Sequence, residues 1–225
     1  MKWFPFKTRF AKTAPASPEA IEELTEYMRQ RLVEGFLSPD EVLQQVIEDV
    51  AYEHPGEDLA PAASALLPQL LAERATEQRS WPAVTDCDRL DAAFEELNSM
   101  GIMARHDWTC CSNCAAAEMP FEFKRLRGRW QGVSIIGYVC YHHQETEAAA
   151  CGGGLFLGFG STERATSEVD FHARSVEVAQ AACDVLVKHG LPVSWNKTVQ
   201  EKIGVQLNWQ RRARPARFCH NDTSR

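Results

Sequence analysis

The sequence predicts an α+β fold, in which a mixed or antiparallel sheet with packed helices is preceded by a helical N-terminal region. Up to residue 80 the apolar residues recur at helical spacing, whereas after residue 81 strand-like runs mix with helical segments. Elements joined in this way are typical of α+β proteins. We expect an N-terminal arm at 1–16, a helical region at 17–80, an α+β domain at 81–210 that holds a cysteine cluster, and a basic tail at 211–225.

Three helices are expected in the helical region, and two of them have clear start signals. Ser17-Pro18 supplies an N-cap followed by proline at the first helical position. Ser38-Pro39-Asp40-Glu41 forms a capping box at the start of the second helix, which should stop at His54-Pro55-Gly56. The third helix should run from 62 to about 79, with a kink or a delayed start at Pro68.

The α+β domain should open with a helix that starts near Thr85 and ends at Gly101. A strand at 102–108 then leads into the cysteines and a helix that begins at about Cys111. The remaining elements are expected in the order of strands at 133–141 and 155–159, a helix at about 170–189, and strands at 193–195 and 203–209. The polar segment before residue 155 is expected to be a loop between two strands.

The composition is that of an ordinary globular protein, with 44% hydrophobic and 24% charged residues. The chain has no run of about 18 apolar residues, so we expect no membrane span. The first residues lack the apolar segment and cleavage site of a secretory signal, and we therefore expect a cytoplasmic protein. In that compartment the eight cysteines would be reduced thiols or metal ligands rather than a disulfide framework.

The net charge of −7 is unevenly distributed along the chain. Residues 1–12 and 211–225 each carry +4, which leaves −15 on the body between them. An acidic body makes duplex nucleic acid an unfavourable partner, while the basic termini could contact an acidic surface, including the protein's own body.

Three cysteines lie within five residues in the segment Thr109-Cys110-Cys111-Ser112-Asn113-Cys114. Cys111 and Cys114 form a C-x-x-C pair at a helix start, where backbone amides lower a thiol pKa. This pair could therefore work in thiol exchange, with Cys111 as the nucleophile and Cys114 as the resolving thiol. Alternatively the cluster could hold zinc, or the thiols could be inert packing residues. The zinc ligands would be Cys110, Cys111, Cys114 and His142, with His106, Cys140, His143 and Cys151 as further candidates.

A second polar group follows in the segment Tyr141-His142-His143-Gln144-Glu145-Thr146-Glu147, shortly before Gly152-Gly153-Gly154. His142 or His143 could exchange protons with Glu145 or Glu147 as general acid and base. Such a pair would suit a small hydrolase, although the sequence identifies no nucleophile for it. The glycine spacing matches no phosphate-binding motif, and a polar strand-exit loop explains the segment equally well.

The chain resembles an uncharacterised bacterial family known as a domain of unknown function. The resemblance covers most of residues 81–210 and includes Glu145, where the family more often has aspartate. It implies no activity, but it points to the cysteine cluster and the His-Gln-Glu-Thr-Glu segment as one linked surface. The matching segments are Trp81–Leu90, Thr109–Cys114, Gly137–Glu147, Gly152–Leu155 and Trp195-Asn196.

These patterns favour a binding or accessory protein whose cysteine cluster holds a structural zinc ion. Two enzyme alternatives stay open at this point. One is a thiol-dependent oxidoreductase that uses Cys111 and Cys114, and the other is a small hydrolase that uses His142 and Glu145. The substrate, the protein partner and the oligomeric state do not follow from the sequence.

Overall fold

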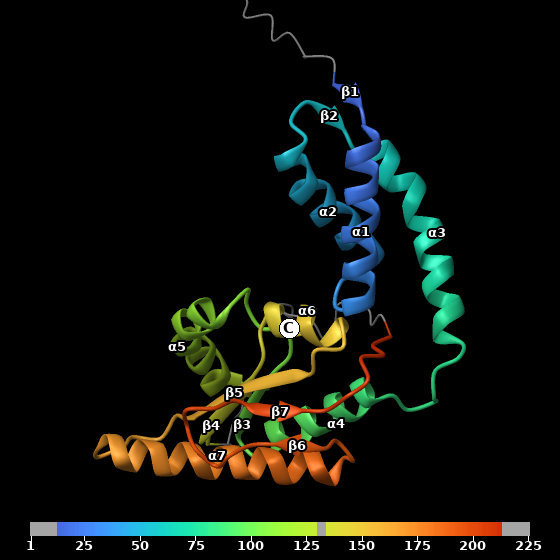
Figure 1. Cartoon of the computed structure of the whole chain (residues 1–225). Coiled ribbons are helices and arrows are strands. Elements are labelled where there is room, and N and C mark those ends of the chain that lie inside the picture. Colours follow the sequence, from blue (N-terminus) through green and yellow to red (C-terminus); the bar gives the residue numbers. More distant parts are fainter. Residues whose placement is uncertain (1–12, 130–133, 213–225) are drawn as a thin grey trace, which may run out of the picture.

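The computed structural model describes residues 13–129 and 134–212, which form an upright helical region standing on an α+β domain (Figure 1). The helical region contains α1 (Pro18–Glu34), α2 (Pro39–Glu53) and α3 (Ala60–Gln78). The short strands β1 (Ala14–Pro15) and β2 (Glu57–Asp58) pair in parallel at its far end. The arm expected at 1–16 lies mostly outside the described residues.

The predicted helix starts are confirmed. The Ser17 side chain accepts a hydrogen bond from the amide of Ala20, and Ser38 and Glu41 complete a capping box. Pro68 lies inside α3 without ending it. The three helices bury a hydrophobic core of their own, which is separate from the core of the α+β domain and contains Ala20, Leu24, Met28, Leu32, Val42, Val46, Val50, Leu59, Ala63 and Leu70.

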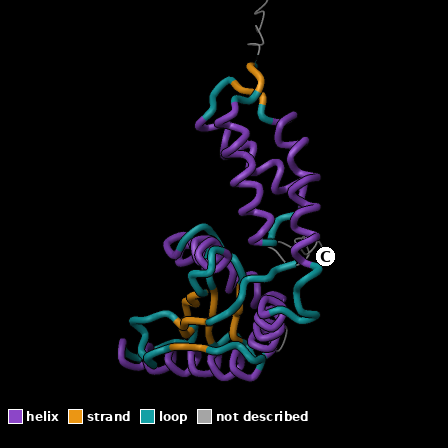
Figure 2. Tube along the Cα trace, turned by 45° about the vertical axis from the view of Figure 1, so that its right-hand side comes forward, coloured by secondary structure: helices purple, strands orange, loops and turns teal. Residues whose placement is uncertain are grey.

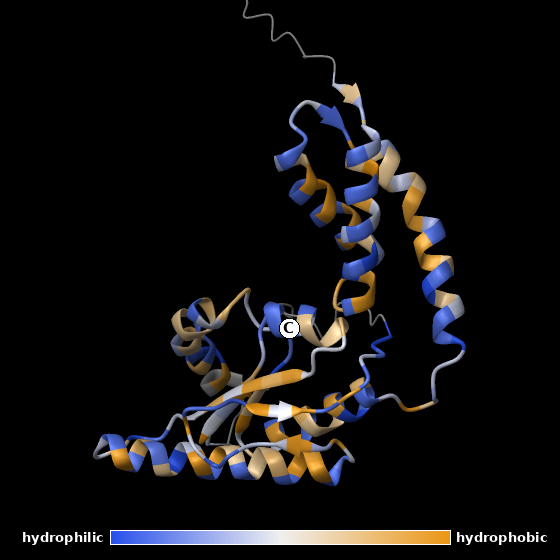
Figure 3. Cartoon of the chain, in the orientation of Figure 1, coloured by the Kyte–Doolittle hydropathy of each residue, from blue (hydrophilic) through white to orange (hydrophobic). Residues whose placement is uncertain are grey.

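The predicted mixed sheet is also confirmed, with five strands in the order β3-β4-β5-β7-β6. Strand β3 pairs in parallel with β4, and all other neighbours are antiparallel. The strands are β3 (Ile102–Arg105), β4 (Gly137–Cys140), β5 (Leu155–Ser161), β6 (Val193–Ser194) and β7 (Ile203–Val205). Figure 3 shows an apolar β5 surrounded by helices of mixed character, as expected for a central strand covered by amphipathic helices.

Helices cover both faces of the sheet. On one face α4 (Asp86–Ser99) and α7 (Glu168–Lys188) enclose the main core. On the other face α5 (Ser112–Arg129) covers β3 and β4 through a smaller core that includes Met103, Trp108 and Cys140. Helix α6 (His143–Ala150) lies between the sheet and the lower end of α1 (Figure 1). Figure 2 shows the helical region above the α+β domain from a second direction.

Three sequence predictions about this domain were wrong. The segment expected as a polar loop is helix α6, because its residues after His142 are good helix formers and its end is closed by Gly152 at φ +83°. The strand expected at 102–108 stops at Arg105, and that expected at 203–209 stops at Val205. Within the mixed sheet, β3, α5 and β4 form a parallel βαβ unit, which local sequence patterns do not reveal because strand direction depends on distant pairing.

The helical region contacts the α+β domain through the C-terminal end of α1. Gly35 ends this helix at φ +76°, and the backbone carbonyl of Val33 accepts hydrogen bonds from Trp209 and Arg74. Of the basic tail expected at 211–225, the structure describes only Arg211 and Arg212. Arg211 is buried rather than solvated, so the packed part of the chain extends past residue 210.

Among the described residues, no helix is both long enough and apolar enough to cross a membrane.

Candidate functional site

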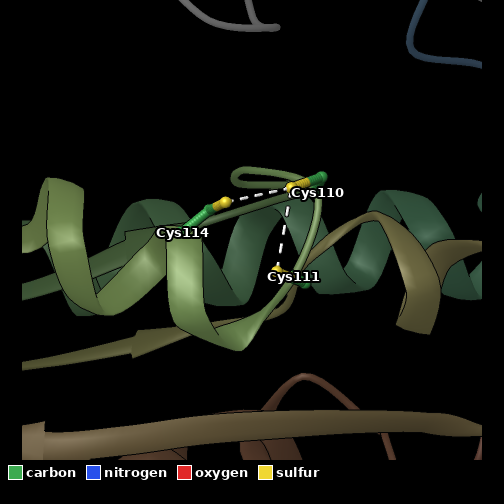
Figure 4. Close-up of side chains that lie close together, drawn as sticks. All are labelled: Cys110, Cys111 and Cys114. Carbon is green, nitrogen blue, oxygen red and sulfur yellow. Dashed lines mark hydrogen bonds between the residues drawn. The ribbon is translucent and has the colours of Figure 1, made fainter.

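The sulfur atoms of Cys110, Cys111 and Cys114 come together at the start of α5, within 4.8 Å of one another (Figure 4). The Sγ of Cys110 lies 3.8 Å from that of Cys111 and 3.2 Å from that of Cys114. Cys110 is exposed, and the other two are partly buried. Cys110 thus lies closer to Cys114 than to its sequence neighbour Cys111.

The loop before α5 is held by several independent contacts. Trp108 is buried, and its amide donates to the carbonyl of Tyr141 at 2.8 Å. Asp107 and Thr109 both have left-handed backbones, with φ of +44° and +65°. Such conformations cost non-glycine residues about 1–3 kcal/mol and are common at functional sites. The Thr109 hydroxyl donates to the carbonyl of Cys111, which also accepts the first helical hydrogen bond of α5.

The thiols of Cys111 and Cys114 differ in acidity. Hydrogen bonds from the backbone amide of Cys114, the thiol of Cys110 and the amide of Asn113 lower the pKa of Cys111. The pKa of Cys114 is raised to about 12, because its hydrogen bonds with Cys110 and Cys111 and the negative charge of their thiolates favour the protonated thiol. Cys111 is therefore the thiol that ionises more readily of the two, and its thiolate lies at the positive end of the α5 dipole.

The sulfur spacing suits a metal ion that binds thiolates. Tetrahedral zinc with Zn–S bonds of about 2.3 Å places its sulfur ligands about 3.8 Å apart. The Cys110–Cys111 sulfur distance of 3.8 Å matches this spacing, and the Cys110–Cys114 sulfur distance of 3.2 Å would need to increase slightly to match it. Within the described part of the chain no fourth ligand joins the three cysteines, so the group leaves one tetrahedral position open.

The other cysteines expected as candidates lie elsewhere. Cys140 is buried under α5, and burial raises its pKa to about 12. Cys183 is buried in α7, and burial raises its pKa to about 11. Cys151 is exposed at the end of α6. His106 is stacked on Phe94, with ring centroids 4.2 Å apart.

His142 does not join the cysteine group but contacts Ser112, which lies between Cys111 and Cys114 in the sequence. Its Nε2 lies 2.9 Å from the hydroxyl of Ser112, the first residue of α5. Its Nδ1 lies 2.5 Å from a carboxylate oxygen of Glu145, whose other oxygen pairs with Lys202. Burial lowers the pKa of His142, and the negative charge of Glu145 only partly opposes this shift. The imidazole is thus held in its neutral form near neutral pH.

His143 and Glu147 belong to a different group, which joins α6 to α1. The Nδ1 of His143 lies 3.1 Å from Asp107, and its Nε2 lies 3.3 Å from Glu147. Glu34 of α1 adds a buried carboxylate, and Arg31 contacts Glu34 at 3.1 Å, Glu147 at 3.5 Å and His143. Glu34, His143 and Glu147 have the geometry of metal ligands. The Arg31 guanidinium, however, already supplies the positive charge among them.

Three residues of these groups were not predicted from the sequence, namely Ser112, Arg31 and Glu34. Ser112 lay inside the cysteine motif, where a serine at a helix start reads as an ordinary cap. Arg31 and Glu34 belong to the helical region, and no local pattern connects them to residue 143. The His-Gln-Glu-Thr-Glu segment lies beside the cysteine cluster, because the amide of His143 donates to the carbonyl of Thr109 at 3.0 Å and the preceding His142 contacts Ser112.

The fold and this site define an α+β protein with a three-thiol cluster at a helix start. The chain belongs to the family described as a domain of unknown function, DUF6891, whose model matches residues 17–213. The resemblance to an uncharacterised domain family is thereby confirmed. No curated protein and no solved structure matches the chain.

Proposed function

We propose that this protein binds one zinc ion through the thiolates of Cys110, Cys111 and Cys114, and that it works as a binding or accessory protein. The convergence of three sulfur atoms within 4.8 Å carries this proposal. An ion here would join the loop that carries Cys110 to the first turn of α5. In that position it would stabilise the strained backbone at Thr109.

The open fourth position distinguishes this site from a closed structural zinc site. Structural zinc is almost always held by four protein ligands, whereas sites with three protein ligands exchange the fourth. Because Cys110 is exposed, water or a donor atom of a partner molecule can complete the tetrahedron. The proposed zinc ion is thus a point at which a partner or a small ligand attaches.

Metal analysis of the untagged protein, purified under reducing conditions, tests this proposal. We expect about one zinc ion per chain in the native protein and loss of zinc in the single variants C110S, C111S and C114S. The matched control is C151S, because Cys151 is also exposed but lies outside the cluster. Equal zinc content in C114S and C151S would refute the proposal.

Thiol exchange is a second candidate function, favoured by the lowered pKa of Cys111. The contact of 3.2 Å between the sulfur atoms of Cys110 and Cys114 favours a disulfide between these two residues on oxidation. Mass spectrometry of peptides from the oxidised protein without reduction distinguishes this bond from a Cys111–Cys114 bond. A protein that stays fully reduced at mildly oxidising potential would argue against thiol exchange.

A further inference from the structure

Three residues beside the cysteine cluster have the arrangement of a nucleophile, a base and an orienting acid. The Ser112 hydroxyl lies 2.9 Å from Nε2 of His142, and the opposite ring nitrogen lies 2.5 Å from Glu145. Ser–His pairs at this distance, with an acid on the far side of the ring, recur in hydrolases of unrelated folds. Ser112 comes from α5 and the other two come from α6, so tertiary packing creates the arrangement.

The local surroundings fit these roles. Ser112 is exposed and therefore accessible to a substrate, whereas His142 is 7% exposed. Neither Nδ1 of His142 nor the facing oxygen of Glu145 has another hydrogen-bond partner, although their present alignment falls short of a good hydrogen bond. Lys202 pairs with the second oxygen of Glu145 and holds this carboxylate in place beside the ring. Ser112 also lies at the positive end of the α5 dipole, where developing negative charge is stabilised.

We propose that Ser112, His142 and Glu145 form a hydrolytic site that cleaves carboxylic esters through an acyl-serine intermediate. The Ser112 oxygen attacks the ester carbonyl carbon while its proton passes to Nε2 of His142. The ester C–O bond then breaks, and the alcohol leaves with that proton. Water next attacks the acyl carbon and gives a proton to His142, which returns it to the Ser112 oxygen as the acid departs. Glu145 lies against the opposite ring nitrogen and orients the ring.

The proposed hydrolysis needs no metal ion, so it goes beyond the proposed zinc binding. Each of the two proposals can be refuted without affecting the other. A fluorophosphonate probe, which phosphonylates activated serines, tests it directly on the full-length chain after treatment with a chelator. We expect the label on Ser112, located by peptide mass spectrometry, and hydrolysis of p-nitrophenyl acetate that S112A abolishes. Because Ser112 is exposed, this variant should fold normally.

The chain supplies a matched internal control in Ser17 and Ser167, which also lie at helix starts but cap their helices with no histidine partner among the described residues. They should remain unlabelled. H142Q should slow labelling about 10²-fold, which is the usual contribution of a general base, with melting curves used to verify that the variant is folded. Equal labelling of Ser112 and Ser17, or an unchanged rate in folded H142Q, would overturn the proposal.

Discussion

Arg211 and Asp91 form a buried ion pair with two hydrogen bonds, of 2.9 and 3.2 Å, although 120 residues separate them in the sequence. The Arg211 guanidinium also lies over the rings of Phe36 and Trp209, at 4.5 and 5.4 Å from their centroids. The Arg211 side chain therefore connects the segment after β7 to Asp91 of α4 and to Phe36, which follows the end of α1. This contact contributes to joining the helical region to the α+β domain.

Replacing Arg211 by alanine should lower the free energy of unfolding by about 3–5 kcal/mol, because it removes one partner of a buried ion pair. The matched control is R212A, which removes a partly exposed pair with Asp88 and should cost at most about 1 kcal/mol. Urea denaturation of both variants measures the difference. Equal losses would mean that the buried pair does not hold this junction.

The sequence predicted most of the fold because caps and apolar periodicity are local signals. Ser17, Ser38 and Thr85 mark the starts of three helices, and each caps its helix in the structure. Strand direction and strand ends were less predictable, since they depend on pairing partners far along the chain. The segment 143–150 was mistaken for a loop because its polar first turn concealed a short helix.

In the candidate site too, local features could be predicted from the sequence, whereas contacts between distant segments could not. The cysteine cluster was visible in the sequence because its three members lie within five residues. The contacts of Ser112 with His142 and of Arg31 with His143 were not, because they join elements that meet only in the folded chain. Burial also determined the acidities of His142 and Cys140, and burial depends on the packing of several elements.

The contact between α1 and α6 should weaken as the pH rises. Its hydrogen bond to Asp107 raises the pKa of His143 above 6.5, so the folded state binds this proton more tightly than the unfolded state. The resulting stability is fully present below pH 6.5 and is lost as the pH rises through the folded-state pKa. Burial raises the pKa of Glu34 above 4.5, so the folded state also binds this proton more tightly than the unfolded state. The stability that results is likewise lost as the pH rises, but in a lower pH range.

Urea denaturation at a series of pH values measures this effect. The free energy of unfolding should fall above pH 6.5 in the native protein, and H143Q should show a smaller fall. H172Q is the matched control, because His172 lies half-exposed on α7, away from this contact. An unchanged slope in H143Q would show that His143 does not link protonation to stability.

In metal-free protein, iodoacetamide should alkylate Cys111 faster than Cys140 or Cys183. Amide hydrogen bonds lower the pKa of Cys111, whereas burial raises the other two to about 12 and 11. Zinc should protect Cys111 and leave the reaction of Cys151 unchanged. Peptide mass spectrometry over time measures each rate, and equal rates for Cys111 and Cys183 would contradict the assigned acidities.

Replacing Trp108 by alanine should affect both stability and metal binding. The ring is buried beneath α5, and loss of a buried tryptophan costs about 3–5 kcal/mol. Because Trp108 anchors the loop that carries Cys110, zinc affinity should also fall in competition with a chelator dye. F121A, which removes a 75% exposed ring from the same helix, should change neither value. Unchanged zinc affinity in folded W108A would mean that the loop needs no such anchor.

The coordination of the bound zinc ion tests the central proposal most directly. X-ray absorption spectroscopy of the zinc-loaded protein should show three sulfur neighbours at about 2.3 Å and one oxygen or nitrogen neighbour at about 2.0 Å. That set corresponds to Cys110, Cys111 and Cys114 with one open position taken by an outside ligand. A spectrum with only oxygen and nitrogen neighbours would contradict zinc binding by the cluster, and one with four sulfur neighbours would contradict the open position.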